Sequence, residues 1–165
     1  MMKKKILALA IGSILSAGVQ AALTDIVITE YVEGSSYNKA IELTNFGDDD
    51  FTFPSNIGIT KQTNGTKGSW STLENLEGIK ILAGQTLVLV DKNTKSAAVR
   101  AAVTENGGTP VISGTFGNGD DVHALADITV PGSPILLDVV GVVDGGKGKK
   151  WGEDITLRRR LLTGE

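Results

Sequence analysis

The sequence predicts an all-β protein, an antiparallel β-sandwich with one short helix, and three observations carry this prediction. Short runs rich in β-branched and aromatic residues recur along the chain, separated by clusters of Gly, Asn, Asp and Ser that are typical of turns. Several runs alternate apolar and polar residues, which is the period of a half-buried strand. Only residues 93–103 show a helical pattern. We expect about eight or nine short strands, the cadence of a sandwich.

The first two strands are predicted near the start of the chain. Residues 26–29 are β-branched and residues 40–45 alternate, with turn formers between the two runs. In the second strand, Ile41 and Leu43 share the face that is expected to meet the core. The opposite face is expected to meet water and consists of Ala40, Glu42 and Thr44.

Two later patterns define the middle of the chain. Asn64-Gly65 is the clearest hairpin signal, because a type I′ turn needs a positive φ at both central residues. It is predicted to join a strand at residues 57–63 to a strand at residues 67–73. Residues 86–91 are apolar on both faces, which favours a central strand.

The helix of residues 93–103 is rich in Ala and is expected to cross between the two sheets, with its most regular part near Ser96–Val103. Asn93 or Thr94 is the candidate N-cap, and Asn106-Gly107-Gly108 is expected to end the helix. The core is predicted to contain apolar residues from four strands: Ile28, Ile41, Leu43, Leu87, Leu89, Leu136 and Val140.

Three motifs in the same order resemble a known family. The run EYVEGSSYNKAIELTN begins at Glu30, FGNGDD occupies residues 116–121, and Trp151-Gly152 is followed by TLRR at residues 156–159. Together they resemble the lamin-tail domain, in the form found at the front of secreted bacterial nucleases. The resemblance extends from about Leu23 to the C-terminus and implies an immunoglobulin-like β-sandwich. A fold alone implies no activity.

The N-terminus is typical of a signal peptide. Lys3, Lys4 and Lys5 precede an apolar run that is too short to span a bilayer, and cleavage is expected before Ala22. The chain therefore divides into a signal peptide at residues 1–21 and one domain at residues 22–165, secreted or periplasmic, without a transmembrane segment. Removing three lysines from a chain of net charge −3 leaves the mature domain at −6. There is no Cys, so its core must hold the domain without disulfides.

No catalytic residue and no cofactor is predicted. The chain has one His and lacks the ligand spacings of common metal sites, and His123 is expected to lie on a strand face. The resemblance implies that nuclease relatives carry a separate metal-dependent phosphodiesterase domain, which this chain, ending at Glu165, is expected to lack. Asp48–Asp50 and Asp120-Asp121 are weak candidates for a Ca²⁺ site, but solvated acidic turns are the favoured interpretation.

Two groups of residues are candidates for binding. The first is a basic patch that would contact phosphates or single strands, or else protect an edge strand from aggregation. Its members are Lys147, Lys149, Lys150, Trp151, Arg158 and Arg160. The second is a loop surface at one end of the sandwich. Its members are Tyr31, Ser35, Ser36, Tyr37, Asn38 and Lys39.

Two functional hypotheses follow from these observations. In the first, the protein is an exported, non-catalytic lamin-tail domain that acts as a binding or interaction module, with nucleic acid or an envelope or secreted protein as its undetermined partner. In the second, it is the leading fragment of a secreted DNase that lacks its catalytic domain. The acidic balance of the mature domain argues modestly against strong general binding of nucleic acid.

Overall fold

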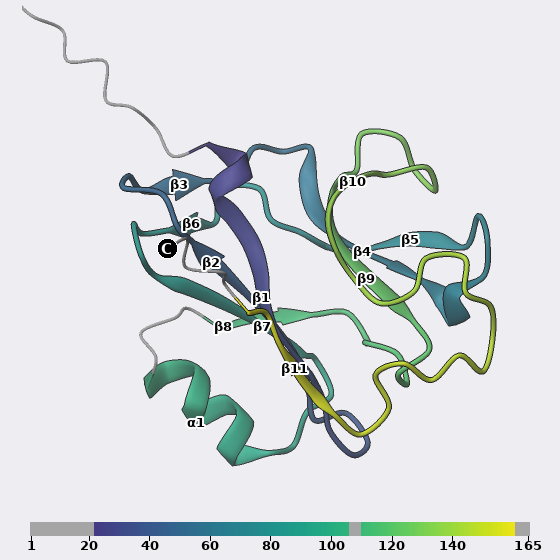
Figure 1. Ribbon diagram of the computed structural model, residues 1–165. Coiled ribbons are helices and arrows are strands. Elements are labelled where there is room, and N and C mark those ends of the chain that lie inside the picture. Colours follow the sequence, from purple (N-terminus) through teal and green to yellow (C-terminus); the bar gives the residue numbers. More distant parts are fainter. Residues whose placement is uncertain (1–21, 106–109, 161–165) are drawn as a thin grey trace, which may run out of the picture.

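A computed structural model describes residues 22–105 and 110–160 and confirms the predicted β-sandwich with one short helix (Figure 1). The larger sheet contains, in spatial order, β11 (Thr156–Arg158), β1 (Ile26–Glu33), β2 (Lys39–Asn45), β7 (Thr86–Asp91) and β8 (Pro110–Ser113). The second sheet contains β10 (Ile135–Val140), β9 (Val122–Asp127), β4 (Ile57–Gln62) and β5 (Trp70–Asn75). The predicted signal peptide and the predicted helix stop at residues 106–108 lie outside the described residues.

Smaller elements complete the sandwich. β3 (Phe51–Thr52) and β6 (Lys80–Ile81) form a separate two-stranded ribbon, and two short 3₁₀ turns are η1 (Leu23–Asp25) and η2 (Thr63–Gly65). The helix is α1 (Ala97–Glu105). All strand pairs in the described part of the chain are antiparallel except β7 and β8, which are parallel and are connected through α1.

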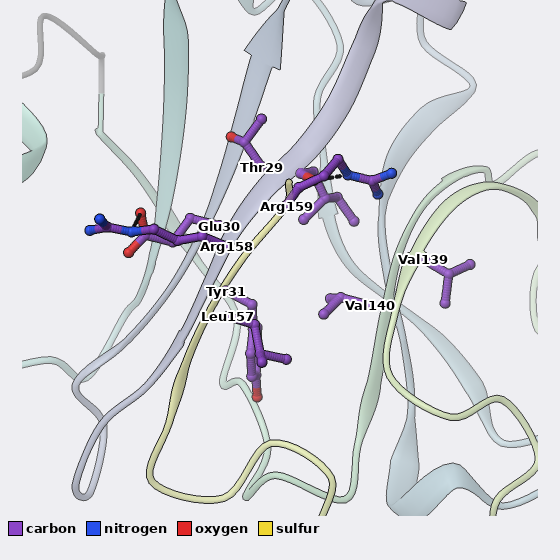
Figure 2. A pocket seen from close by; sticks show the side chains of 9 residues that line it. Thr29, Glu30, Tyr31, Val139, Val140, Leu157, Arg158 and Arg159 are labelled. Atoms are coloured by element: carbon purple, nitrogen blue, oxygen red, sulfur yellow. Dashed lines mark hydrogen bonds and ion pairs between the residues drawn. The ribbon is translucent and has the colours of Figure 1, made fainter. Parts of the chain in front are cut away.

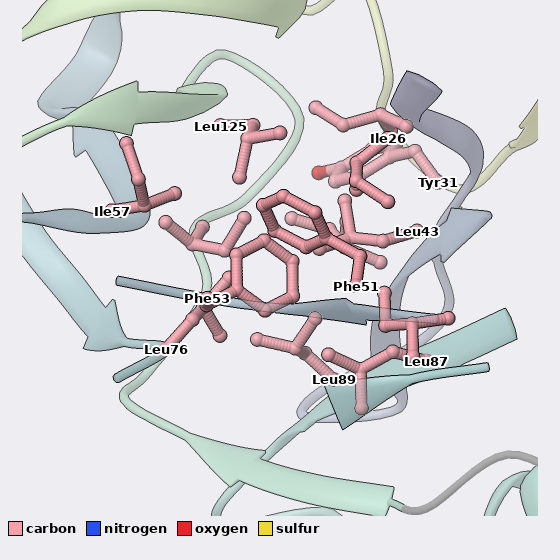
Figure 3. Close-up of a cluster of buried hydrophobic side chains, with 14 of the residues drawn as sticks. Ile26, Tyr31, Leu43, Phe51, Phe53, Ile57, Leu76, Leu87, Leu89 and Leu125 are labelled. Carbon is pink, nitrogen blue, oxygen red and sulfur yellow. The ribbon is translucent and has the colours of Figure 1, made fainter. Parts of the chain in front are cut away.

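The core lies between the two large sheets and includes the ribbon. Phe51 and Phe53 meet edge to face at 5.0 Å, and Figure 3 shows their rings between side chains of both sheets. The predicted core positions of β1, β2 and β7 are buried, which confirms those strand faces: Ile28, Ile41, Leu43, Leu87 and Leu89. Leu136 and Val140 of β10 are only half-buried, because β10 is an edge strand. The core therefore depends mainly on the larger sheet, β4, β9 and the ribbon.

The outer face of the larger sheet does not meet water as predicted. Ala40 is buried there with Val88 and Val90, and Val99 of α1 packs against this second apolar cluster. Thr44, also expected in water, is buried. The helix thus covers the outer face of one sheet instead of crossing between sheets, since it connects β7 to its own neighbour β8. The central position predicted for β7 is confirmed.

Two local predictions were wrong in detail. The Val99 backbone N–H donates to Ser96 Oγ at 3.2 Å, so Ser96 caps the helix and Asn93 and Thr94 do not. Asn64 and Gly65 both have positive φ, as predicted, and β4 does pair with β5. The connection is nevertheless a loop over residues 63–69 that contains η2, because Gln62 pairs with Trp70 and a two-residue turn is excluded.

Truncating a core leucine tests the assignment of strand faces. Leu43→Ala or Leu89→Ala is expected to lower the free energy of unfolding by about 2–5 kcal/mol, because both side chains are fully buried and their removal leaves a cavity. Leu82→Ala is the matched control, since Leu82 is 51% exposed and its truncation should change stability by about 0.5 kcal/mol or less. Urea denaturation measures all three. A loss below about 1 kcal/mol at both core sites would mean that the faces are reversed.

Candidate binding site at the loop end of the sandwich

Three segments that are far apart in the sequence line one open pocket of about 510 Å³ at one end of the sandwich. These are the segment after β1, the start of the FGNGDD turn, and the segment after Trp151-Gly152. The first two belong to motifs that carry the family resemblance, and the third lies between the two parts of the remaining motif. The lining residues are Glu33, Gly34, Ser36, Tyr37, Lys39, Phe116, Gly117, Asn118, Glu153 and Asp154.

The FGNGDD turn is shaped by the buried carboxylate of Asp121. This carboxylate accepts hydrogen bonds from the backbone N–H of Asn118 and of Asn64, both at 2.9 Å, and so joins the turn to the loop after β4. A Cβ at residue 117 would lie 1.5 Å from Asp121 Oδ2, so only Gly117 allows the carboxylate to reach these amides. Asp121 thus acts as a buried carboxylate that caps turn amides.

Two further contacts fix the other walls of the pocket. The buried carboxylate of Asp91, at the end of β7, accepts hydrogen bonds from the backbone N–H of Phe116 and of Asn93, both at 2.8 Å. The Gly152 backbone N–H donates to the Gly119 carbonyl at 3.0 Å, which holds the segment after Trp151 against the turn. The three lining segments are therefore tied to strands of both sheets.

A buried ion pair forms the floor of the pocket. Lys39 Nζ pairs with Glu33 Oε1 and also donates to the Gly34 carbonyl at 3.3 Å. Both side chains are nearly inaccessible to solvent. Burial lowers the pKa of Lys39, while the negative charges of Asp154, Asp91 and Asp121 oppose that shift.

A β-bulge in β1 explains why Glu33 points inward. The pairing register of β1 with β2 shifts between Ile28 and Glu30, and the buried positions change from Ile26 and Ile28 before the shift to Tyr31 and Glu33 after it. Without the extra residue, strict alternation would turn Glu33 toward solvent. The bulge therefore delivers a carboxylate to the pocket.

The structure divides the predicted loop surface. Ser35, Ser36 and Tyr37 are exposed, as expected of a recognition loop. Asn38 is half-buried, and its Oδ1 accepts a hydrogen bond from Thr94 Oγ1 at 3.0 Å. The predicted surface positions of the other two members were wrong: Lys39 lies in the buried ion pair, and Tyr31 is only 1% exposed.

A cluster of aromatic rings adjoins the pocket through Phe116. His123 lies 5.4 Å from the rings of both Tyr31 and Phe116, and Tyr31 lies 5.2 Å from Trp151. The placement of His123 on a strand face is confirmed, and both of its ring nitrogens are buried without a hydrogen-bond partner among the described residues. Burial lowers the pKa of His123 to about 3, with Lys61 and Lys39 contributing in the same direction, so the ring is neutral at pH 7.

The residues of the predicted basic patch have different surroundings. The loop of Lys147 and Lys149 is tied to the ends of the four-stranded sheet, since Gly146 N–H donates to the Gly65 carbonyl and Gly148 N–H to Asp120. Lys150 pairs with Glu153. Trp151 is half-buried and packs on the core cluster, so its ring is not an exposed platform for stacking. These contacts do not favour one continuous basic patch. Binding by such a patch stays a prediction.

The arginines of the predicted patch lie along the edge of the other sheet. Arg158 Nε donates to Glu30 Oε2 at 3.0 Å, and Arg160 is exposed. Figure 2 shows Arg158 and Glu30 pointing away from Val139 and Val140, whereas Leu157 lies with these valines around a small pocket of about 190 Å³. The exposed pair contributes little stability, because water screens it.

Arg159, which was not among the predicted site residues, closes the open side of the sandwich. Its guanidinium donates to both carboxylate oxygens of Asp138 on β10, at 2.6 and 2.7 Å, and to the Ile28 carbonyl at 2.8 Å. Asp138 in turn accepts the Ile28 backbone N–H at 2.7 Å. The side chains of Arg159 and Asp138 thus bond to the backbone carbonyl and N–H of Ile28, in a part of β1 that does not pair with β11. This role is structural.

The acidic turns show ordinary structural contacts, but the expected solvation was wrong for Asp120 and Asp121, which are both buried because their carboxylates bind backbone N–H groups. Asp50 pairs with Lys80 at 3.0 Å, and this hydrogen bond lowers the pKa of Asp50. Asp120 accepts the Gly148 backbone N–H at 3.0 Å. Within residues 22–105 and 110–160, no group of three His, Cys, Asp or Glu side chains is placed to hold a metal ion.

Comparison with known proteins gives no family for this chain. No protein-family model and no curated protein sequence matches it. None of the helices in the described part of the chain is both long and apolar enough to cross a membrane. The pocket therefore has to be interpreted from its own residues.

Sequence reasoning missed most of the pocket lining. Glu33 belonged to a recognised motif but was not assigned to a site, and the FGNGDD turn was considered only for a weak Ca²⁺ site at Asp120-Asp121. Glu153 and Asp154 gave no signal beyond their position after Trp151-Gly152. The convergence of the three motifs in one pocket is the feature that could have identified them, because motifs distant in sequence that share a surface point to one site.

The buried neutral His123 predicts a specific dependence of stability on pH. Its folded-state pKa is far below 6.5, so between pH 6.5 and about pH 3 only the unfolded chain binds this proton. The free energy of unfolding should therefore fall as the pH falls below 6.5, with a contribution of up to about 1.4 kcal/mol per pH unit from this residue. Urea denaturation of the wild type and of His123→Gln at pH 7, 6, 5 and 4 isolates that contribution. Identical slopes for the two proteins would contradict a neutral His123.

Proposed function

We propose that this protein is an exported, non-catalytic binding module that recognises a partner polypeptide through the pocket at the loop end of its sandwich. The observation that carries the proposal is the assembly of one open pocket from three distant segments, with a buried ion pair as its floor. Its volume of about 510 Å³ falls in the range of about 300–1,000 Å³ usual for ligand sites. Loops on a rigid sandwich are a common setting for recognition.

Two sequence features support the wider proposal. The basic start and short apolar run of residues 1–21 support export. The three motifs resembling a lamin-tail domain support an immunoglobulin-like accessory domain, and all three contribute to the pocket. A polypeptide partner is favoured over nucleic acid because acidic residues line the pocket and the whole chain is negative.

Peptide selection tests this function. A random peptide library displayed on phage is selected against the purified protein, and the enriched peptides are then measured on variants. Tyr37→Ala should weaken their binding by about tenfold, because exposed aromatic residues at the edge of a pocket often dominate affinity. Phe46→Ala, which removes a similarly exposed aromatic residue outside the pocket, and Lys147→Ala/Lys149→Ala should change it by less than about twofold.

Two results would contradict this function. A selection that enriches no sequence would argue against recognition of polypeptides. Enriched peptides that bind Tyr37→Ala normally but lose binding to Lys147→Ala/Lys149→Ala would place recognition on the lysine loop instead.

The proposal also predicts that the chain does not cleave DNA. Plasmid incubated with the protein and Mg²⁺, Mn²⁺ or Ca²⁺ should stay intact, because hydrolysis of a phosphodiester needs positioned metal ligands or an accessible general base. His123 is buried and holds its proton weakly. Cleavage that persists through repurification and disappears in His123→Gln would overturn the non-catalytic assignment.

A further inference from the structure

The carboxylate of Glu33 has one oxygen that no neighbour satisfies. Glu33 is 4% exposed and lines the pocket, and while Oε1 pairs with Lys39, Oε2 is buried without a hydrogen-bond partner in the described part of the chain. A buried acceptor that lacks a donor is costly, so buried polar groups are almost always paired. A ligand that donates an N–H group into the pocket would satisfy this oxygen.

The charges around the pocket favour a positive ligand. Three carboxylates line it, those of Glu33, Glu153 and Asp154. Lys39 pairs with Glu33 and Lys150 pairs with Glu153, so Asp154 is the lining carboxylate for which no ion pair is described. The buried carboxylates of Asp91 and Asp121 lie behind the wall, and the backbone N–H groups that donate to them carry no charge that would neutralise them. Low exposure to solvent strengthens the field of such charges. The field in the pocket is therefore negative.

An aromatic ring stands at the edge of this negative pocket. Tyr37 lines it and remains 46% exposed, so its side chain is accessible to a ligand. Cations bind to the faces of aromatic rings, with a contribution that grows as water is excluded. The pocket thus combines an unsatisfied acceptor, a negative field and an accessible ring.

A guanidinium group fits this combination better than a metal ion or an ammonium group. The described residues place no cluster of three His, Cys, Asp or Glu ligands around a metal. An ammonium group is compact and strongly hydrated, whereas a guanidinium group is planar, weakly hydrated, stacks on aromatic rings and donates several hydrogen bonds in a fixed fork. Arginine is the only common side chain that carries it.

We propose that the pocket binds an arginine side chain of the partner polypeptide, with the guanidinium group between the Tyr37 ring and the carboxylates of Glu33 and Asp154. The proposal rests on the proposed function, because it names what that pocket recognises. Glu33 accepts a hydrogen bond at the floor, and Asp154 supplies the second negative charge nearer the solvent.

The test uses a small probe and exposed pocket residues. The tripeptide acetyl-Gly-Arg-Gly-amide is titrated into ¹⁵N-labelled protein, and the same peptide with citrulline, a neutral isostere of arginine, or with lysine serves for comparison. Saturable shifts are expected for the amides of residues 34–38, 116–118 and 152–154 with the arginine peptide, weaker ones with lysine, and none with citrulline.

The variants are chosen so that the fold survives. Tyr37 and Asp154 are exposed, so their replacement should not disturb the core. The backbone of residue 154 has φ 54°, a value that Asn adopts readily. Glu33 is not replaced, because its loss would leave the buried charge of Lys39 unpaired. Tyr37→Ala should weaken the arginine peptide about fivefold and Asp154→Asn about two- to fivefold. Asp48→Asn, an exposed carboxylate that does not line the pocket, should leave it within about 1.5-fold.

The outcomes separate this inference from the proposed function. Equal binding of the arginine and citrulline peptides, or unchanged binding in both pocket variants, would overturn it. The inference would also be overturned if CaCl₂ shifted the same amides and the arginine peptide did not, because the pocket would then bind an inorganic cation. If peptides selected from the library bind through Tyr37 but contain no arginine, the inference fails while the proposed function stands. If neither library nor arginine peptide binds, both fail.

Discussion

Buried carboxylates that accept backbone N–H groups hold the loop end of this protein together. Asp91 joins the end of β7 to Phe116, and Asp121 joins the FGNGDD turn to the loop after β4. A chain without cysteines cannot use disulfides for this purpose, so loops have to be tied through such contacts. Charge-assisted hydrogen bonds to amides are among the stronger ties available. Each buried carboxylate also adds negative charge behind the pocket.

Hydrophobic alternation predicted the faces of the central strands well and the edges poorly. Leu43 and Leu89 were assigned correctly because both lie in strands paired on each side, where inward residues are fully covered. Val140 was placed in the core from an apolar run, yet hydrophobicity does not reveal that β10 pairs on one side only. Ala40 was assigned to a water-facing position because it shares its strand face with the polar residues Glu42 and Thr44. Alternation reports the polarity of a face and not the helix that covers it.

The candidate site lay beyond the reach of pattern reading for a definite physical reason. A single inserted residue in β1 reverses the alternation, so that Tyr31 and Glu33 share the inner face with Ile28. Read with strict alternation, the segment places a charged residue in solvent, and the bulge has no composition of its own. The acidic neighbours Glu153 and Asp154 reach the pocket through tertiary contacts of the turn. The sequence therefore predicted the loop that carries Tyr37 but not the carboxylates of Glu33, Glu153 and Asp154 that line the same pocket.

The buried pair of Glu33 and Lys39 is hard to explain as a device for stability alone. Removing two charges from water costs several kcal/mol per ion in real proteins, roughly what their mutual attraction returns, and apolar replacements of such pairs are often neutral or stabilising. Lys39 satisfies one carboxylate oxygen of Glu33, whereas the other is buried without a partner in the described part of the chain. A lysine in this place fixes the orientation of the carboxylate through one of its two oxygens. The pair is thus better understood as a support that presents a charged acceptor, and the bulge in β1 as the feature that brings it there.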